Sequence, residues 1–217
     1  MCHLSLGWLH FREHKEKIKP VKTNEITLPT KQYLMKTLIW KGIFYQSLEY
    51  FNLQSDDKNY TVESKIIGCL EDKIYSIEYK IHIDKDWLVQ DFLIESEINK
   101  VKRTLAGKKI QDQWEINGVV NPEFDHFDFI DISLTPFTNT LPINNLKLSE
   151  RNSQKIDVLY IDVLKHEIKP VQQQYTRTAV NKYLYENIET DFKAEISVDE
   201  SGLVTSYPEL FEKIAEL

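Results

Sequence analysis

Glycine is scarce in this chain, with 6 in 217 residues, and no glycine-rich loop that could cradle a phosphate is present. Cysteine is scarcer still, because Cys2 and Cys69 are the only two, and they form no disulfide framework. Cys69 lies in an apolar run, which favours a buried free thiol. These absences exclude the common nucleotide motifs and a disulfide-stapled fold, and they favour a reducing compartment.

Long apolar runs and clusters of basic charge are missing as well. No segment is long enough to span a bilayer, and the apolar residues 4–11 lack both a preceding basic region and a following cleavage site. With a formal net charge of -7, the chain offers no basic stripe to nucleic acid or to an anionic membrane surface. We therefore expect a cytoplasmic protein that neither inserts stably into membranes nor binds nucleic acid.

Signatures of catalysis are also absent. The chain contains no Gly-x-Ser-x-Gly elbow, no Cys-His signature and no paired His or Cys spacing of a zinc site. His82 and Asp84 lie two apart on an expected strand and could both reach an ion, but a solvated histidine is the simpler interpretation. We therefore expect no enzyme activity, no cofactor and no metal.

Aromatic residues, in contrast, make up 12% of the chain, and β-branched residues are frequent, which favours sheet. Residues 74–83 and 191–199 alternate apolar and polar side chains, which predicts strands with one buried face. Residues 156–164 are apolar on both faces, which predicts a strand covered on both sides. The closing residues, Pro208 to Leu217, instead predict a short helix with Pro208 in its first turn.

A weak internal repeat relates two parts of the chain at an offset of 115 residues. Residues 60–92 overlay residues 175–207 without a gap, and both stretches read as strand, aspartate turn and strand, with Asp84 matching Asp199. One interpretation is a duplication, which would give two similar half-sheets with a groove between them. The other is that two hairpins look alike because all hairpins do.

The most distinctive stretch runs from Asp131 to Ile143 and reads DISLTPFTNTLPI. Pro136 and Pro142 each fix φ and remove a donor, so neither belongs in the middle of a central strand. A rigid turn that only closes two strands is one interpretation. The other is a polar corner that binds a ligand, following a strand over residues 127–134.

This run resembles the bacterial "putative glycolipid-binding" family, once catalogued as a domain of unknown function. Trp40, the region from Tyr79 to Trp87, Gln174-Tyr175 and the closing run from Val198 to Pro208 fit the resemblance too. The resemblance implies a spiral β-roll similar in outline to half-barrel lipid carriers, and the function of the family was suggested from its fold. We expect residues 1–34 to be a flexible N-terminal extension and residues 35–217 to form the glycolipid-binding β-roll domain.

The motif also carries the candidate ligand contacts. If Asp131 lies inside, it is a buried carboxylate that needs donors, and backbone amides of residues 138–140 could supply them. In the functional interpretation it lines a groove, because a carboxylate and an amide beside aromatic faces suit sugar hydroxyls. Tryptophans offer stacking faces, although core packing is the other interpretation for each of them, Trp114 included. The expected ligand-binding residues are Asp131, Ser133, Phe137, Thr138, Asn139, Trp40 and Trp87.

These patterns together predict an all-β spiral β-roll or open barrel-like sheet, with an internal pseudo-repeat and a short C-terminal helix. The predicted function is non-catalytic binding of an amphipathic small molecule, and the family resemblance implies a glycolipid. Two alternatives stay open. One is a structural or interaction protein that forms a homodimer through an apolar sheet face, and the other is a small-molecule enzyme of unidentified type.

Overall fold

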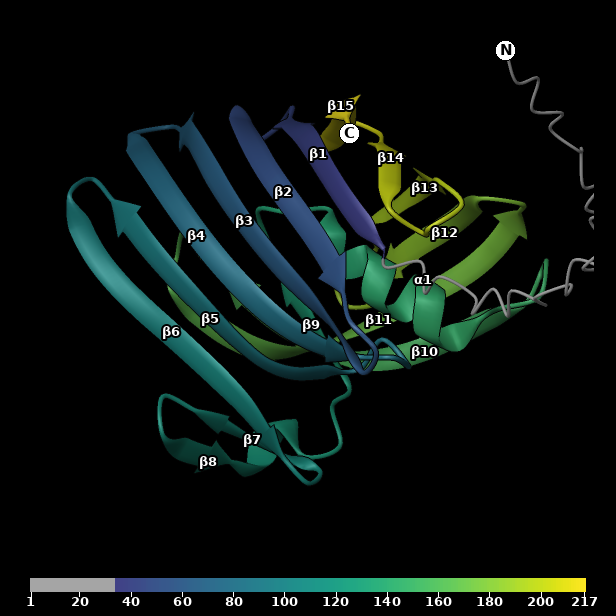
Figure 1. The fold of residues 1–217 in the computed structure, drawn as a ribbon, viewed down its shortest axis with the longest axis horizontal. Coiled ribbons are helices and arrows are strands. Elements are labelled where there is room, and N and C mark those ends of the chain that lie inside the picture. The colour runs from purple at the N-terminus through teal and green to yellow at the C-terminus, as the bar shows by residue number, and fades with distance from the viewer. Residues whose placement is uncertain (1–33) are drawn as a thin grey trace, which may run out of the picture. The chain divides into compact units, whose positions relative to one another are not determined.

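The structure, a computed structural model, describes residues 34–217. These residues form one sheet of 15 strands that curves into an open roll (Figure 1). Apart from Leu34, the predicted flexible extension over residues 1–34 lies outside the described residues, so it stays a prediction. The strands and helices are β1 (Met35–Gly42), β2 (Ser47–Ser55), β3 (Asn59–Leu70), β4 (Lys73–Asp84), β5 (Val89–Ile98), β6 (Val101–Ile110), β7 (Gln113–Ile116), β8 (Val119–Asn121), η1 (Pro122–Phe124), β9 (Phe129–Ile132), η2 (Phe137–Asn139), α1 (Thr140–Leu146), β10 (Ser153–Asp162), β11 (Glu167–Ala179), β12 (Lys182–Asn187), β13 (Lys193–Val198), β14 (Val204–Tyr207) and β15 (Phe211–Glu216).

The strand order explains why the roll is open. It runs β8-β7-β6-β5-β4-β3-β2-β1-β15-β14-β13-β12-β11-β10-β9, so the last strand pairs with the first while β8 and β9 remain as edges. Every neighbouring pair is antiparallel except β9 and β10, which run parallel. The prediction of an all-β, open barrel-like sheet is confirmed.

The prediction of a short C-terminal helix is wrong. Phe211–Glu216 form β15, which pairs with both β1 and β14. The apolar residues at helical spacing make no buried stripe, since Ile214 is 51% exposed and Phe211 is the one fully buried residue of β15. The segment is extended because its backbone supplies hydrogen bonds to the edge of β1, which would otherwise be unpaired. This pairing outweighs the local helical pattern.

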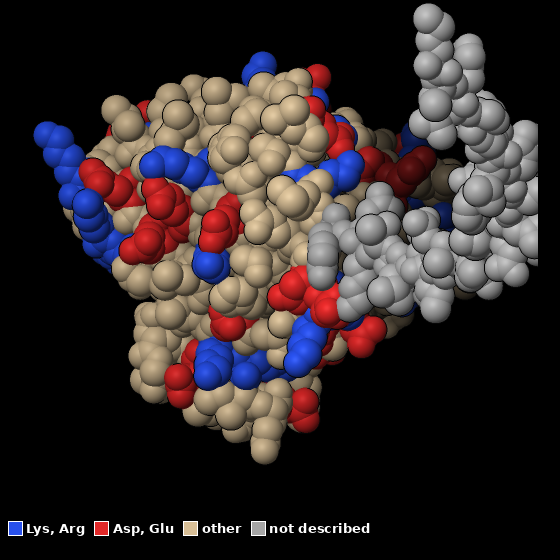
Figure 2. Space-filling model, in the orientation of Figure 1, with Lys and Arg blue, Asp and Glu red and all other residues tan. Residues whose placement is uncertain are grey.

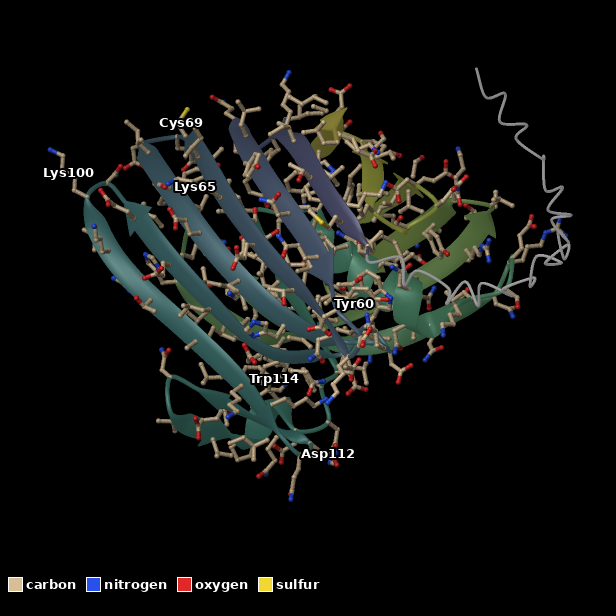
Figure 3. All side chains as sticks on the ribbon, viewed as in Figure 1. Tyr60, Lys65, Cys69, Lys100, Asp112 and Trp114 are labelled. Atoms are coloured by element: carbon tan, nitrogen blue, oxygen red, sulfur yellow. The ribbon has the colours of Figure 1, made fainter. Side chains whose placement is uncertain are left out.

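Alternation decides which face of each strand is buried. The inward residues of β4 are each at most 3% exposed, namely Tyr75, Ile77, Tyr79, Ile81 and Ile83. Both faces of β10 are covered, since Val158 and Leu159 are each at most 1% exposed. Both predictions are confirmed. The same alternation turns Cys69 outward at the end of β3, where it is exposed, so the predicted buried thiol is wrong (Figure 3).

A ten-residue segment, residues 134–143, lies inside the roll, and we call it the interior segment. It is buried at every position and contains η2 and the first turn of α1. The Phe137 ring packs on that of Phe51 in β2, with centroids 4.9 Å apart. Pro136 precedes η2 and Pro142 lies in the first turn of α1, where a missing amide donor costs little. The strand before this segment is β9, which is shorter than the predicted strand over 127–134.

The internal repeat has a structural counterpart in two turns. The side-chain Oδ1 of Asp84 accepts hydrogen bonds from the backbone amides two and four residues later, at 2.9 and 3.0 Å. Asp199 does the same at 2.8 and 3.0 Å. Both turns contain a residue with positive φ at the same place, Trp87 at 65° and Gly202 at 76°. All of these positions are 115 residues apart, as the sequence overlay predicts.

Two consecutive asparagines of α1 bridge these equivalent turns. Asn145 donates to the backbone carbonyl of Asp86 at 2.7 Å, and Asn144 donates to that of Ser201 at 2.9 Å. Asp86 and Ser201 again lie 115 residues apart. The helix that continues the interior segment therefore ties the two halves of the repeat to each other.

The outer surface of the described part mixes both signs of charge. Lys and Arg side chains are interspersed with Asp and Glu on the face shown in Figure 2, and no basic stripe crosses that face. Within residues 34–217, no helix is long and apolar enough to cross a membrane.

Candidate ligand-binding groove

A groove of ≈ 340 Å³ opens beside the second half of the sheet. Its walls come from distant parts of the chain: the β1–β2 turn, β9 with the start of the interior segment, the β10–β11 hairpin, β12 with the connection that follows it, and β14 with β15. One side is aromatic and another is polar. We call it the aromatic groove, and its aromatic wall consists of Tyr45, Tyr160, Tyr185, Phe192, Tyr207 and Phe211.

Most rings of the aromatic wall contact one another. Phe211 stacks on Tyr45 with centroids 5.6 Å apart and meets Tyr207 edge-on at 6.2 Å. Tyr207 in turn lies 6.0 Å from Tyr185 and 6.4 Å from Phe192. Such offset and edge-on pairs stabilise each other beyond their buried area, so the wall holds its shape without a ligand. Phe192 is 41% exposed, which leaves its ring accessible at the groove.

The polar floor consists of Asp131, Ser133, Thr135 and Asn139, which β9 and the interior segment bring together. Asp131 is half-buried, and its two oxygens accept hydrogen bonds from Thr138 Oγ1 at 3.0 Å and from Gln173 Nε2 at 2.6 Å. Both donors are side chains, so the expected backbone amides of residues 138–140 do not hold this carboxylate. Asn139 accepts from the Tyr175 hydroxyl at 2.8 Å.

Asp131 has no cationic partner among residues 34–217. Burial raises the pKa of its carboxyl, although the hydrogen bonds from Gln173 and Thr138 act in the opposite direction. The charge also reaches the aromatic wall. The pKa of Tyr160 and of Tyr185 is raised first by burial and next by the negative charge of Asp131. Asp131 is therefore a carboxylate of the groove floor that is held by neutral donors.

A second carboxylate lies behind the floor. Glu49 is 2% exposed, and its Oε1 accepts hydrogen bonds from Ser64, Tyr79 and Thr135 at 2.7, 2.6 and 2.9 Å. Its Oε2 has no hydrogen-bond partner in the described part of the chain. Burial raises the pKa of Glu49 to about 7, against the lowering effect of the three hydroxyls. Thr135 is shared by this network and the groove floor.

The predicted site residues fall into two groups. Asp131, Ser133 and Asn139 line the groove. Thr138 is 2% exposed and supports Asp131 from behind. Phe137, which packs on Phe51, is fully buried and does not line the groove.

The three tryptophans within residues 34–217 lie away from the aromatic groove. Trp40 is fully buried and donates its indole N–H to the backbone carbonyl of Val204 at 2.7 Å. Trp87 stacks on Tyr60 with centroids 4.4 Å apart and lines a separate cavity near α1. Trp114 is fully buried and contacts Phe92 at 5.6 Å. The structure therefore places these indoles in packed surroundings, and the aromatic wall is built from other rings.

The aromatic wall is the part of the site that sequence reasoning missed. Its six members are spread from residue 45 to residue 211, and no two belong to one strand. Only the high content of Tyr and Phe hinted at such a wall. The sequence contained only a weak indication that Glu49 points inward. It shares a strand face with the apolar Phe51 and Leu53, but the other face is also apolar, with Leu48 and Tyr50, so the buried face was ambiguous.

The acidic and histidine side chains suggested as ion ligands lie apart. His82 Nδ1 contacts Asp91 Oδ1 at 2.6 Å, while Asp84 holds its own turn. Within residues 34–217, no three His, Cys, Asp or Glu side chains gather as a metal site would require.

Comparison with known proteins agrees with this architecture. The family model described as "Putative glycolipid-binding" matches residues 37–213. The crystal structure of a DUF1089 family protein from Pseudomonas aeruginosa, at 1.80 Å resolution, is 34% identical and superposes with a TM-score of 0.70. The match covers 76% of this chain and 92% of that one. No curated protein matches the chain. With most of its length matched, the chain belongs to the "Putative glycolipid-binding" family.

Proposed function

We propose that the protein binds an amphipathic ligand without catalysis, that the leading ligand class is a glycolipid, and that the ligand lies in the aromatic groove. The observation that carries this proposal is the juxtaposition of an aromatic wall and a polar floor in one open groove. Aromatic faces pack on apolar surface, while carboxylate and hydroxyl groups fix the orientation of a polar head. The name of the family agrees with this ligand class.

The size of the groove limits what enters it. At ≈ 340 Å³ it lies near the lower end of the range of roughly 300 to 1,000 Å³ that small-molecule sites occupy. A sugar-sized head group fits this space, whereas long acyl chains need further surface. Phe44 offers such surface, because its ring lies 5.1 Å from that of Tyr45 and is 56% exposed. In this arrangement the floor binds the head and the apolar tail follows the rings outward.

The affinity would come from apolar burial, at about 25 cal/mol per Å² before ordering costs are subtracted. The wall is already packed ring against ring, so few side chains must be ordered when a ligand enters. The groove needs no chemical step to perform this role.

Native mass spectrometry tests the proposal. The protein is purified gently from its own host, its intact mass is measured, and an organic extract is analysed for lipids. We expect a stoichiometric co-purified lipid or glycolipid in the wild type. The matched variants are Phe192→Ala, which alters the groove, and Tyr50→Ala, which removes a comparably exposed ring from the outer face of β2. Loss of the lipid from Tyr50→Ala but not from Phe192→Ala would contradict the proposed site.

A second candidate function is self-association through the outer face of the sheet. Leu48, Tyr50, Ile67 and Ile74 are each 47% exposed or more, and Leu48 lies directly opposite Ile67 in the β2–β3 register. Contiguous exposed apolar surface is typical of interaction sites. If this function holds, sedimentation gives a dimer that Ile67→Lys converts to a monomer. A monomer in the wild type would reject it.

A further inference from the structure

The charges of the aromatic groove do not balance. Its lining holds three carboxylates, Asp131, Asp162 and Glu167, against two lysines, Lys165 and Lys169. Lys165 contacts Asp162 at 3.0 Å, which neutralises that pair at the rim. Lys169 lies over the Tyr160 ring, with its Nζ 5.7 Å from the centroid. Neither Glu167 nor Asp131 has an ion-pair partner within residues 34–217, and of these two only Asp131 belongs to the polar floor.

The surroundings of Asp131 strengthen the preference for positive charge. Its hydrogen-bond donors, Thr138 and Gln173, are neutral, and each carboxylate oxygen retains capacity to accept another bond. Beside the floor lie the six rings of the aromatic wall, and Tyr160 is the direct strand neighbour of Asp131 in the β9–β10 register. The faces of aromatic rings carry the negative end of a quadrupole. A negatively charged ligand would meet both the carboxylate and the ring faces. A cation would find attraction from each of them.

We propose that the aromatic groove binds an organic ammonium group, with Asp131 as its counter-charge and the rings of Tyr160, Tyr185 and Tyr207 as its cage. Ring faces attract ammonium groups, and cages of aromatic rings are a recurrent way to bind quaternary ammonium ligands. Lys169 over Tyr160 is an internal example of the same contact at the rim. The proposal rests on the proposed function and names the chemistry of the ligand head, which would be an amine-bearing sugar or lipid head group.

Three probes with the same tail separate head-group charge from apolar burial. They are hexyltrimethylammonium, hexyl β-glucoside and hexyl sulfate, each titrated below its micellar concentration and followed by calorimetry. We expect the ammonium probe to bind the wild type about tenfold more tightly than the glucoside, and the sulfate to bind most weakly. This ranking uses the native protein and does not depend on a variant that folds.

Asp131→Asn then tests the role assigned to the carboxylate. We expect its affinity for the ammonium probe to fall about tenfold more than its affinity for the glucoside. Tyr50→Ala, on the outer face, serves as the control and should leave the ranking of the three probes as it is. Circular dichroism establishes that each variant is folded.

The outcomes are distinguishable. If the glucoside binds as tightly as the ammonium probe, or if Asp131→Asn weakens both equally, the ammonium inference is overturned while the groove remains a ligand site. If the sulfate binds most tightly, the charge argument is wrong. If none of the three probes binds, the proposed function fails together with the inference.

Discussion

The two halves of the internal repeat share a turn but not an interior. In the first half, the inner face of β4 is fully covered, and Ile77 is 0% exposed. The position 115 residues later is Phe192, which is 41% exposed and lines the aromatic groove. The interior segment packs Phe137 on Phe51 of the first half. Ile77 of β4 is therefore enclosed in the core, whereas its repeat equivalent, just before β13, is accessible at the groove.

The two inward carboxylates show the same contrast. Glu49, in the first half, is 2% exposed and held by three hydroxyls. Asp131 is half-buried and lines the groove. A carboxylate enclosed by packed side chains affects stability, whereas one that a ligand can reach can affect binding. Under the proposed function, the ligand lies beside Asp131, the carboxylate that it can reach.

The largest expected effect comes from removing the ring that fills the first half. Phe137→Ala leaves a cavity against Phe51, so we expect the free energy of unfolding to fall by about 3–5 kcal/mol. The sequence alone suggested a groove residue whose loss would weaken binding and leave stability intact. Urea unfolding measures the effect, and a loss below about 1 kcal/mol would place Phe137 outside the core.

Paired substitutions at equivalent repeat positions test the comparison directly. Ile77→Ala should lower the free energy of unfolding by about 2–5 kcal/mol, because the site is fully buried. Phe192→Ala should cost less than about 1 kcal/mol in stability and weaken ligand binding roughly tenfold, since the ring is exposed at the groove. Denaturation and calorimetric titration of the two variants check this. Equal losses of stability would contradict the assignment of Ile77 to the core and of Phe192 to the groove.

The buried Glu49 predicts a dependence of stability on pH. Its pKa is raised in the folded state to about 7 from its usual 4.5, so the folded protein holds a proton that the unfolded chain releases. The free energy of unfolding is therefore highest below pH 4.5, where Glu49 is protonated in both states. It falls as the pH rises from 4.5 towards 7, by roughly 3 kcal/mol in total. Wild type should therefore lose about this much relative to Glu49→Gln between pH 5 and pH 8 in urea unfolding. Parallel pH profiles of the two proteins would rule out the buried charge.

The smallest expected effects come from the asparagines that tie the halves together. Asn144→Ala and Asn145→Ala each remove one hydrogen bond to an equivalent turn, so each should cost about 1 kcal/mol. Similar losses would indicate that the two asparagine hydrogen bonds stabilise the two turns equally, although the surroundings of the two repeat halves differ. If one substitution is neutral in thermal unfolding and the other costs more than about 2 kcal/mol, the equivalence of the turns fails.

Much of the sheet follows from the sequence because alternation is a local signal. The face assignment of β4 and the double coverage of β10 depend only on neighbouring residues. The interior segment could not be predicted as helical, because two prolines and four polar side chains contradict the usual helical pattern and only burial explains them. The strand β15 escaped prediction for a related reason, since its partners β1 and β14 decide its conformation.

The groove was predictable only in part. Asp131, Ser133 and Asn139 stood out because polar residues that alternate with apolar ones in a proline-containing run need hydrogen-bond partners or a function. The aromatic wall depends on the pairing of β15 with β1, which brings Phe211 beside Tyr45 across most of the chain length. Contacts of that sequence separation carry no local pattern, so a single sequence does not reveal them.

The most direct measurement is photo-crosslinking with a diazirine-bearing alkyl glucoside, followed by mass spectrometric mapping of the labelled peptides. We expect labelling of the peptides that contain Tyr160, Phe192 and Tyr207, and we expect it to be competed by excess unlabelled alkyl glucoside and reduced in Phe192→Ala. Labelling confined to the outer face of β2 and β3, at Leu48, Tyr50 and Ile67, would contradict it, as would the absence of competed labelling anywhere.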